Sequence, residues 1–385
     1  MTQRRALACA LVSAVLAALA GGATGAGTAV AAAPGTMVAW GSDADGQLGN
    51  GAGGGHLKPG AVSGLTGVTQ MDGGREHVVV LKSTGTVWAW GLNSDGQVGD
   101  GTKTNRTAPV QVKGLTGVKD VATGHYSSMA LKSTGTVWMW GLNNFGQLGN
   151  GTKTSSDVPV QVKGLTNVTA IAGARDHSLA VKSNGTVWAW GDNEFGNLGN
   201  GMTTSSDVPV QVKGLTNVVF VAGGRDHSIA VEKNGSVWTW GWNAYGQLGD
   251  GTKTNRTVPV RVPGVNKVIV AAAGANHSLA LTSNGVIWAF GQNTFGQLGD
   301  GTGVSRVSPV RVVGVTNVVS IGAGRLHSLA IESNGSVWTW GDNDLGQLGD
   351  GTTANRLRPV HVVGVTGAEE VAGGRDYSVA LIASP

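Results

Sequence analysis

Histidine recurs in this sequence at steps of fifty residues or multiples of fifty, and a column of imidazoles is the first feature that could do chemistry. The column holds His77, His177, His227, His277 and His327, with Ser127 and Tyr377 at the two remaining places. Ligands of one metal ion must lie within about 4 Å of each other, because metal–nitrogen bonds are about 2.1 Å long. Equivalent places on stacked sheets are about 10 Å apart. We therefore predict no metal site, and expect each histidine to join adjacent strands of its own repeat through its two ring nitrogens.

Other chemical patterns are weak. Asp43-Ala-Asp45-Gly46 resembles the start of a calcium loop, but the downstream bidentate Glu is missing and a sister copy reads Asn143-Asn-Phe145. No Ser/His/Asp or Cys/His set recurs with a credible geometry, and no phosphate-binding glycine loop precedes a helix. We predict no catalytic centre and no cofactor.

Arginine and aromatic residues form a second group of candidates. Five arginines share one place in the repeat, and His125-Tyr126 takes that place in another copy. Trp242 is the one tryptophan of thirteen that lies outside the repeated tryptophan positions. Trp, Tyr and Arg dominate binding hot spots, so these residues predict a binding surface. The full candidate set is Trp242, Tyr245, Arg75, Arg175, Arg225, Arg325, Arg375, Tyr126, His125, Phe145, Phe195 and Phe295.

These candidates must be positioned by a repeat architecture. A Trp-Gly pair occurs at 40–41, 90–91, 140–141, 190–191, 240–241 and 340–341, with Phe290-Gly291 as the one variant. Within one copy, the runs 168–172, 178–182 and 186–190 are β-patterned, and Asn184-Gly185 predicts a hairpin between the last two. A fourth run, 208–212, contains a proline that confines it to a sheet edge. Each repeat therefore predicts about four short antiparallel strands and no helix.

Seven such sheets predict a ring. A linear β-solenoid is the competing architecture, but the first Trp-Gly unit has no partner strand before it, and 377–381 has no Trp-Gly unit after it. One half-repeat at each end makes a whole blade if the ring closes and hides both edges. The fold class we predict is all-β: a seven-bladed β-propeller of about 50-residue, four-stranded repeats, with the last blade closed by the N-terminal strand. The paired indoles, such as Trp188 and Trp190, share one strand face and should pack between blades.

The hairpins also fix where the variable residues lie. Because the Asn-Gly turn lies at one end of each hairpin, the arginine column and the residues after Trp-Gly must meet at the opposite end. The arginines could bridge to carboxylates of neighbouring blades, and the phenylalanines could cap their own blades. Trp242 has no such structural reason, so it is the best indicator of a working surface on this rim.

The N-terminus predicts export. Arg4 and Arg5 precede an apolar run of about fifteen residues, 6–20, and a small-residue tail, which is typical of a secretory signal peptide. We assign 1–33 to the signal and 34–385 to the propeller. The apolar run is short of the roughly 20 residues that span a bilayer. The single cysteine, Cys9, leaves with the signal, and 25 basic residues remain against 23 acidic ones. No Lys/Arg run typical of nucleic-acid binding is present, and no later apolar run is long enough to span a membrane. With the signal removed, we expect a secreted monomer that binds neither nucleic acid nor a membrane.

The motif Trp-Gly-x-Asn-x-x-Gly-Gln-Leu-Gly-x-Gly-Thr, followed by Pro-Val and Gly-x-x-His-Ser-x-Ala-Leu, resembles the regulator of chromosome condensation repeat. The resemblance covers the chain after its signal and implies a seven-bladed propeller in which the histidine is structural. An exported bacterial member is expected, distantly similar to secreted propellers that inhibit β-lactamases through aromatic-rich loops. Eukaryotic members that exchange guanine nucleotides use an inserted wedge, which the unbroken fifty-residue period lacks, so exchange activity is the least favoured function.

Our preferred interpretation is a secreted, non-enzymatic protein-binding propeller whose rim engages a protein or an acidic surface. The alternative is a hydrolase or lyase at the central channel, for which His125 and Tyr126 would be candidates. A third class is a wall-associated adhesion protein, for which no anchor or sorting motif is visible.

Overall fold

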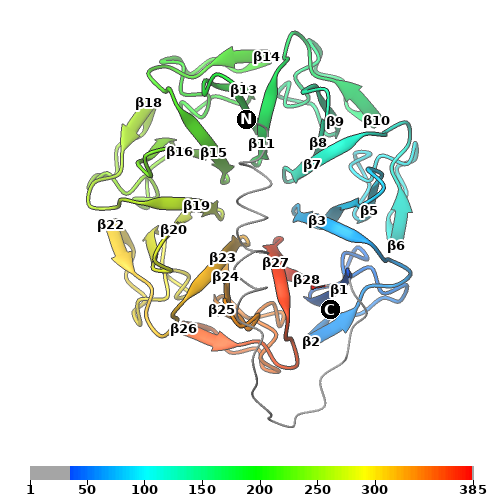
Figure 1. The fold of residues 1–385 in the computed structure, drawn as a ribbon, viewed down its shortest axis with the longest axis vertical. Helices are drawn as coiled ribbons and strands as arrows, with labels where there is room; N and C mark the ends of the chain where they lie inside the picture. The colour runs from blue at the N-terminus through cyan, green and yellow to red at the C-terminus, as the bar shows by residue number, and fades with distance from the viewer. Residues whose placement is uncertain (1–34, 384–385) are drawn as a thin grey trace.

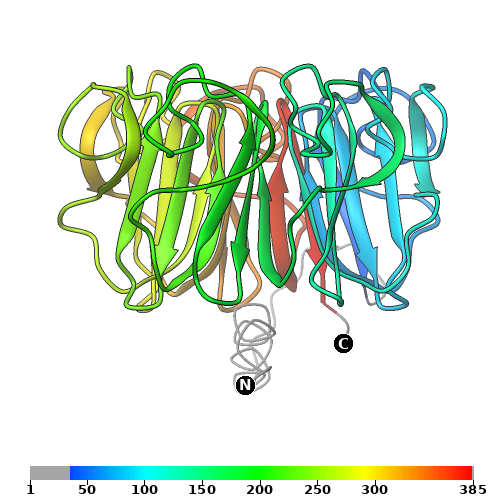
Figure 2. The same ribbon diagram turned by 90° about the horizontal axis from the view of Figure 1, so that it is seen from above.

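The computed structural model describes residues 35–383, and the predicted signal peptide lies outside them. The described chain forms seven four-stranded antiparallel sheets arranged as the blades of a ring (Figure 1). The strands run roughly along the ring axis, so the loops gather on two opposite faces (Figure 2). The predicted all-β, seven-bladed propeller is confirmed.

Each blade presents its strands in the same radial order. The innermost strands are β3 (Val68–Gly73), β7 (Val118–Thr123), β11 (Val168–Gly173), β15 (Val218–Gly223), β19 (Val268–Ala273), β23 (Val318–Ala323) and β27 (Ala368–Gly373). The second strands are β4 (His77–Lys82), β8 (Ser127–Lys132), β12 (His177–Lys182), β16 (His227–Glu232), β20 (His277–Thr282), β24 (His327–Glu332) and β28 (Tyr377–Ile382). The third strands, which carry the Trp-Gly units, are β1 (Thr36–Gly41), β5 (Val87–Gly91), β9 (Val137–Gly141), β13 (Val187–Gly191), β17 (Val237–Gly241), β21 (Ile287–Gly291) and β25 (Val337–Gly341). The proline strands lie outermost, as predicted: β2 (His56–Ala61), β6 (Arg106–Gln111), β10 (Ser156–Gln161), β14 (Ser206–Gln211), β18 (Arg256–Arg261), β22 (Arg306–Arg311) and β26 (Arg356–His361).

The ring closes through a blade made from both ends of the described chain. Its strand order is β2-β1-β28-β27, and β1 pairs with β28 from Thr36↔Ile382 to Gly41↔Tyr377. Figure 1 shows the blue strands β1 and β2 beside the red strands β27 and β28. The N-terminal part contributes β1 and the outer strand β2, and the C-terminal part contributes β28 and β27, so each end supplies the predicted half-repeat.

In the hairpin turns, the glycine alone adopts the left-handed backbone conformation, and the residue before it does not. At 183–185 the Gly185 N–H donates to the Lys182 carbonyl at 2.8 Å, and the Lys182 N–H donates to the Thr186 carbonyl at 2.9 Å. Gly185 has a φ of 79°, whereas Asn184 keeps an ordinary negative φ. Only the glycine therefore needs the left-handed region in this turn.

The paired indoles pack between blades, as predicted. Trp190 is fully buried and joins a core cluster with Met129 and Leu131 of the preceding blade, and Trp188 packs against the same cluster. The Trp190 Nε1–H donates to the Gln147 carbonyl at 2.8 Å, again in the preceding blade. Each space between neighbouring blades is filled in the same manner. The hydrophobic core therefore consists of seven separate clusters between blades, and not of one cluster at the centre of the ring.

The histidine column is structural, but its hydrogen bonds differ from our prediction. We expected bonds within a repeat, whereas the Nε2 atom of each histidine contacts a serine of the next blade. His227 Nε2 lies 2.9 Å from Ser278 Oγ, and Ser278 Oγ donates to the Gln247 carbonyl at 2.9 Å. Because the serine hydrogen is used by that carbonyl, the imidazole must donate from Nε2. The other four pairs are His77–Ser128, His177–Ser228, His277–Ser328 and His327–Ser378.

This arrangement makes the propeller sensitive to acid. Burial lowers the pKa of the five histidines to about 3 or 4, so they are neutral in the folded protein. An unfolded histidine takes up a proton below about pH 6.5, while the folded one does not. Stability must therefore fall as the pH drops from about 6.5 toward 4, by about 1–2 kcal/mol for each histidine at pH 5.

Urea unfolding of the wild type and of His227→Ser at pH 7 and pH 5 measures this effect. Serine is the residue that β8 carries at this place, so the substitution suits the blade. The variant should lose about 1–2 kcal/mol less than the wild type between the two pH values. An identical loss in both proteins would show that the histidine is not held neutral.

Candidate functional site

The two variable columns meet on one face of the ring, which we call the site rim. The link is a backbone hydrogen bond in each blade: the Trp242 N–H, just after β17, donates to the carbonyl of Asp226, just before β16, at 2.8 Å. The same bond joins Leu92 to Glu76, Leu142 to Tyr126, Asp192 to Asp176, Gln292 to Asn276 and Asp342 to Leu326. The predicted juxtaposition of these columns follows directly from the β-hairpin between the second and third strands.

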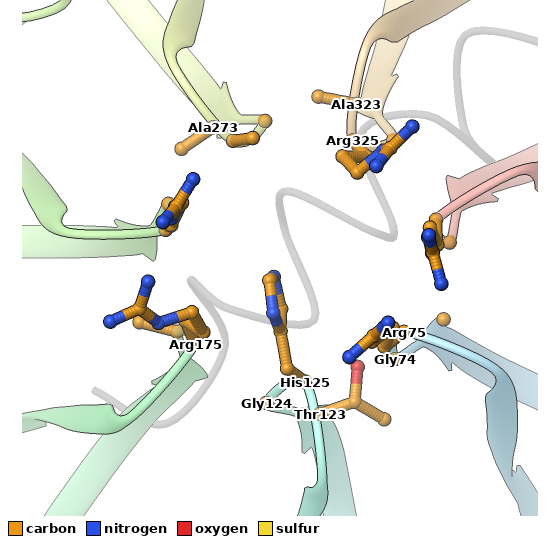
Figure 3. A pocket seen from close by; sticks show the side chains of 18 of the residues that line it. Gly74, Arg75, Thr123, Gly124, His125, Arg175, Ala273, Ala323 and Arg325 are labelled. Carbon is orange, nitrogen blue, oxygen red and sulfur yellow. The ribbon is translucent and has the colours of Figure 1, made fainter. Parts of the chain in front are cut away.

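The arginine column surrounds the mouth of the central channel. A cavity of about 340 Å³ opens there, lined by Arg75, His125, Arg175, Arg225, Ala275, Arg325 and Arg375 together with the ends of the innermost strands. Figure 3 shows the labelled Arg75, Arg175 and Arg325 around the opening and the His125 ring extending toward its middle. Backbone bonds between blades hold these residues: the Arg75 N–H donates to the His125 carbonyl at 3.2 Å, and the Arg375 N–H donates to the Arg75 carbonyl at 2.8 Å.

Three of the five arginines bridge neighbouring blades. Arg175 contacts Asp176 of its own blade at 2.6 Å and Asp226 of the next blade at 3.1 Å. Arg325 reaches Asp376 of the next blade at 3.4 Å. Arg375 likewise reaches Glu76 at 3.0 Å across the closing blade. The ion pairs offset much of the positive charge that the sequence placed on this rim.

Arg225 differs from the bridging arginines. Its ion pair is with its own neighbour Asp226, at 3.2 Å, and its side chain is 45% exposed against 25% for Arg175. Burial raises the pKa of Asp226 to about 6, although Arg175 and Arg225 act in the opposite direction. Arg225 therefore has the most exposed side chain of the five arginines.

His125 and Tyr126 belong to the same rim but have different surroundings: His125 lines the cavity and Tyr126 lies against Arg75. Burial, with the nearby Arg175 and Arg75, lowers the pKa of His125 to about 3, so the imidazole at the cavity is neutral. Tyr126 instead contacts Arg75, whose guanidinium carbon lies 4.9 Å from the ring centroid. This contact fixes Tyr126 against the neighbouring blade's arginine.

Trp242 is the centre of an aromatic cluster that spans two blades. Its ring centroid lies 5.9 Å from that of Phe195 and 5.6 Å from that of Tyr245, the latter edge-to-face. The Arg225 guanidinium carbon lies 6.0 Å from the Trp242 ring centroid. Trp242 is half-buried and Tyr245 is 37% exposed. We call Phe195, Arg225, Trp242 and Tyr245 the aromatic patch.

The other predicted aromatics lie outside the aromatic patch. Phe145, on the loop after β9, is 40% exposed, and Phe295, on the loop after β21, is partly buried. Among residues 35–383, neither makes a ring contact with the cluster around Trp242. The patch is thus centred on the two blades that contain β13 and β17.

Sequence reasoning missed a set of carboxylates inside the channel. Asp72 on β3 accepts from the Thr123 N–H of the next blade at 2.8 Å, and Glu370 on β27 accepts from the Met71 N–H at 3.0 Å. Burial raises the pKa of Asp72 to about 6 and that of Glu370 to about 8. The sequence did contain a signal, because both residues depart from their repeat. The other six copies have Ala or Gly at the position of Asp72, and Gln, Asp, Ala, Phe, Val or Ser at the position of Glu370. These two carboxyls accept from backbone N–H groups on the innermost strands β3 and β7, and they thereby link three consecutive blades.

The described residues contain neither of two common functional features, a metal-ligating cluster or a membrane-spanning helix. In that part of the chain, His, Cys, Asp and Glu side chains nowhere form a group of three or more that could hold a metal ion. The described residues also contain no helix that is long and apolar enough to cross a membrane.

The ion-pair geometry separates structural arginines from accessible ones. Arg175→Ala would leave the buried Asp176 and Asp226 without their shared cation, so we expect a loss of about 1–3 kcal/mol in unfolding free energy. Arg225→Ala removes an exposed side chain and should cost less than about 0.5 kcal/mol. Urea denaturation of both variants at pH 7 measures the difference. Equal losses would contradict the assignment of Arg175 as an inter-blade bridge.

Comparison with known proteins agrees with the repeat and the fold. A family model described as the RCC1-like domain matches residues 17–278, and a model of the regulator of chromosome condensation (RCC1) repeat matches 284–331 and 334–381. A second RCC1 repeat model matches 268–297 and 318–347. A search of curated proteins by sequence gave no match.

Solved structures with the same fold include two with nearly full coverage. Prp20p from Saccharomyces cerevisiae, described with its binding properties to Gsp1p and histones, is 23% identical with a TM-score of 0.82, and 93% of each chain is covered. Human WBSCR16 is 26% identical with a TM-score of 0.81, covering 91% of this chain and 99% of the other. With the family models matching more than half of its length, the chain belongs to the regulator of chromosome condensation (RCC1) repeat family.

Proposed function

We propose that this chain is an exported, non-enzymatic binding propeller that holds a protein partner on its site rim. The observation that carries the proposal is the aromatic patch, in which a tryptophan absent from every sister repeat contacts Phe195, Tyr245 and Arg225. Partly exposed clusters of Trp, Tyr and Arg are the usual composition of interface hot spots. Export remains part of the proposal and rests on the signal-like sequence 1–33.

The aromatic patch has the form of an anchor. Phe195 and Tyr245 support the indole from two sides, which lowers the entropy that Trp242 would lose on binding. Arg225 adds a partly exposed cation next to an apolar surface. An acidic group on the partner would match Arg225, whereas the bridging arginines are already engaged with carboxylates. The acidic partner surface therefore stays a prediction, with Arg225 as its main contact.

The interactions of Prp20p with Gsp1p and histones are not part of this proposal, because an identity of 23% supports the shared fold alone. β-Lactamase inhibition is one specific form that the proposed function could take. It can be tested directly with purified β-lactamases.

Replacing Trp242 should abolish partner capture without damaging the blade. Trp242→Leu introduces the residue found at the same place in two sister repeats, Leu92 and Leu142, so the fold should be retained. We expect at least a tenfold loss of affinity, since hot-spot residues contribute about 2 kcal/mol or more. Cross-linking and mass spectrometry of culture supernatant identify the partner, and calorimetry with that purified partner measures the affinity.

Phe295→Leu is the matched control, because Phe295 occupies the equivalent loop outside the aromatic patch. It should bind as the wild type does. Unchanged affinity of Trp242→Leu would refute the aromatic patch as the binding surface, and equal losses in both variants would indicate a footprint centred elsewhere on the rim.

One observation favours the alternative of an enzyme at the channel. His125 extends into the cavity and is neutral, which a general base requires. His125→Ala separates the two functions: hydrolase or lyase turnover would be lost if the channel were catalytic, while partner binding at the aromatic patch would persist.

A further inference from the structure

One buried position distinguishes the first repeat from the six others. In those six copies an asparagine follows the Trp-Gly unit by two residues and is fully buried. Its Oδ1 accepts the backbone N–H five residues further on, and its Nδ2 donates to the carbonyls nine and eleven residues further on. In the second copy, Asn93 Nδ2 lies 3.0 Å from both the Thr102 and the Thr104 carbonyl oxygens. The same pattern holds for Asn143, Asn193, Asn243, Asn293 and Asn343.

The first copy has Asp43 at this position. Its Oδ1 still accepts the Leu48 N–H at 2.9 Å, so the carboxyl is oriented as the amides are. Its Oδ2 therefore takes the place of the amide nitrogen. Asp43 is 5% exposed, and this Oδ2 atom has no hydrogen-bond partner. The residues nine and eleven positions after Asp43 are Ala52 and Gly54, so the repeat register places their carbonyl oxygens opposite an oxygen, where the other repeats have a donor.

Asn50 supplies a further oxygen. The corresponding side-chain oxygen in the third copy, Asn150 Oδ1, lies 3.4 Å from the Asn143 Nδ2 atom. In the first copy Asn50 Oδ1 accepts the Ala52 N–H at 2.8 Å, while its Nδ2 lies 3.0 Å from His56 Nε2. The amide oxygen is thus turned toward the loop that contains Ala52 and Gly54.

The loop itself is open and adaptable. It reads Gly51-Ala-Gly-Gly-Gly55, and all five residues are exposed. Gly55 stands where the second copy has Asn105, whose Oδ1 accepts the Asn93 N–H. Without that side chain, this side of the loop is open to solvent, while the Asp43 carboxylate itself stays buried.

We propose that Asp43 Oδ2, Asn50 Oδ1 and the carbonyl oxygens of Ala52 and Gly54 bind one Ca²⁺ ion in the place of the amide group. Calcium takes six to eight oxygen ligands at about 2.3–2.6 Å, and water reaching past Gly55 completes the set. The glycine-rich loop can adjust its backbone to bring the carbonyl oxygens to this distance. Mg²⁺ fits less well, because it demands a near-ideal octahedron at about 2.0–2.1 Å.

This site differs from the calcium loop that the sequence resembles. Asp45 is not a ligand, because its Oδ1 accepts from Asn105 Nδ2 at 3.0 Å. With one carboxylate among neutral oxygens, the affinity should fall in the weak range of extracellular modules, with a Kd of about 10⁻⁴–10⁻³ M. The site is independent of the aromatic patch, so its test does not depend on the proposed function.

A proton is the competing occupant, since a neutral carboxyl has the shape of an amide and could donate to the same carbonyls. Burial raises the pKa of Asp43, which is consistent with either occupant. The two differ in their response at neutral pH. Added calcium stabilises the folded protein at neutral pH by pairing with the ionised carboxylate, whereas a proton neutralises the carboxylate and stabilises the folded protein only when the pH falls.

Calorimetric unfolding and equilibrium dialysis of the wild type, Asp43→Asn and Asp45→Asn at pH 7.5 decide between them. About 10 mM Ca²⁺ should raise the Tm of the wild type by about 2 °C, and dialysis should find one ion bound per chain. Asp43→Asn reproduces the residue of six sister repeats, so it should fold, be more stable in chelator and not respond to calcium. Asp45→Asn, an adjacent acid outside the ligand set, should respond as the wild type does.

A wild type that ignores calcium would overturn the proposal. If acidification to pH 4.5 then closed the gap in Tm to Asp43→Asn, the occupant would be a proton. An equal calcium response in Asp43→Asn would also overturn it, since the ion would then bind elsewhere.

Discussion

The contact between an indole and a glycine of the preceding blade sets the geometry of the whole ring. Trp240 donates from Nε1 to the Asn197 carbonyl at 2.8 Å and lies against Gly199. A Cβ on Gly199 would lie 2.8 Å from the same Nε1 atom, and this glycine has a φ of 62°. Both the close approach and the backbone conformation therefore require glycine. Each blade supplies the glycine to one neighbour and an aromatic ring to the other, an indole in six blades and the Phe290 ring in the seventh, so the fifty-residue period is a packing requirement.

The same period explains why the fold was predictable from the sequence and the hydrogen-bond partners were less so. Strand order and edge prolines follow from patterns within one copy, and ring closure follows from the half-repeat at each end of the repeat array. The histidine partner does not, because sequence cannot say whether a ring nitrogen faces its own sheet or the next. Asp100 and Arg106 show a pairing that could have been read: copies with aspartate at the first place have arginine at the second, and copies with asparagine have serine or histidine.

The sequence correctly placed the two variable columns on one rim, but the contacts of the residues in these columns cross between blades. The arginines at 175, 325 and 375 share one sequence position with Arg225, yet the three reach a carboxylate of the next blade and Arg225 does not. Asp226 engages Arg175 and Arg225 together, whereas the blade after it has Asn276 at the equivalent place. One uncharged residue in the neighbouring blade thus leaves Arg225 without a second ion pair. The role of a residue that departs from the repeat therefore becomes clear only when it is compared with the residues that face it from the adjacent blade.

The blade shared by both ends of the described chain has a kinetic consequence. Trp40 donates to the Gln347 carbonyl, 307 residues away, and β1 pairs with β28 along six residues. Contacts between such distant segments carry the largest loop-closure entropy, and they form slowly. Six blades can assemble from neighbouring sequence, but the seventh must wait until nearly the whole chain has been synthesised. The pairing of β1 with β28 is then the last interface to form during folding. It is also the interface at which a strained ring would open first.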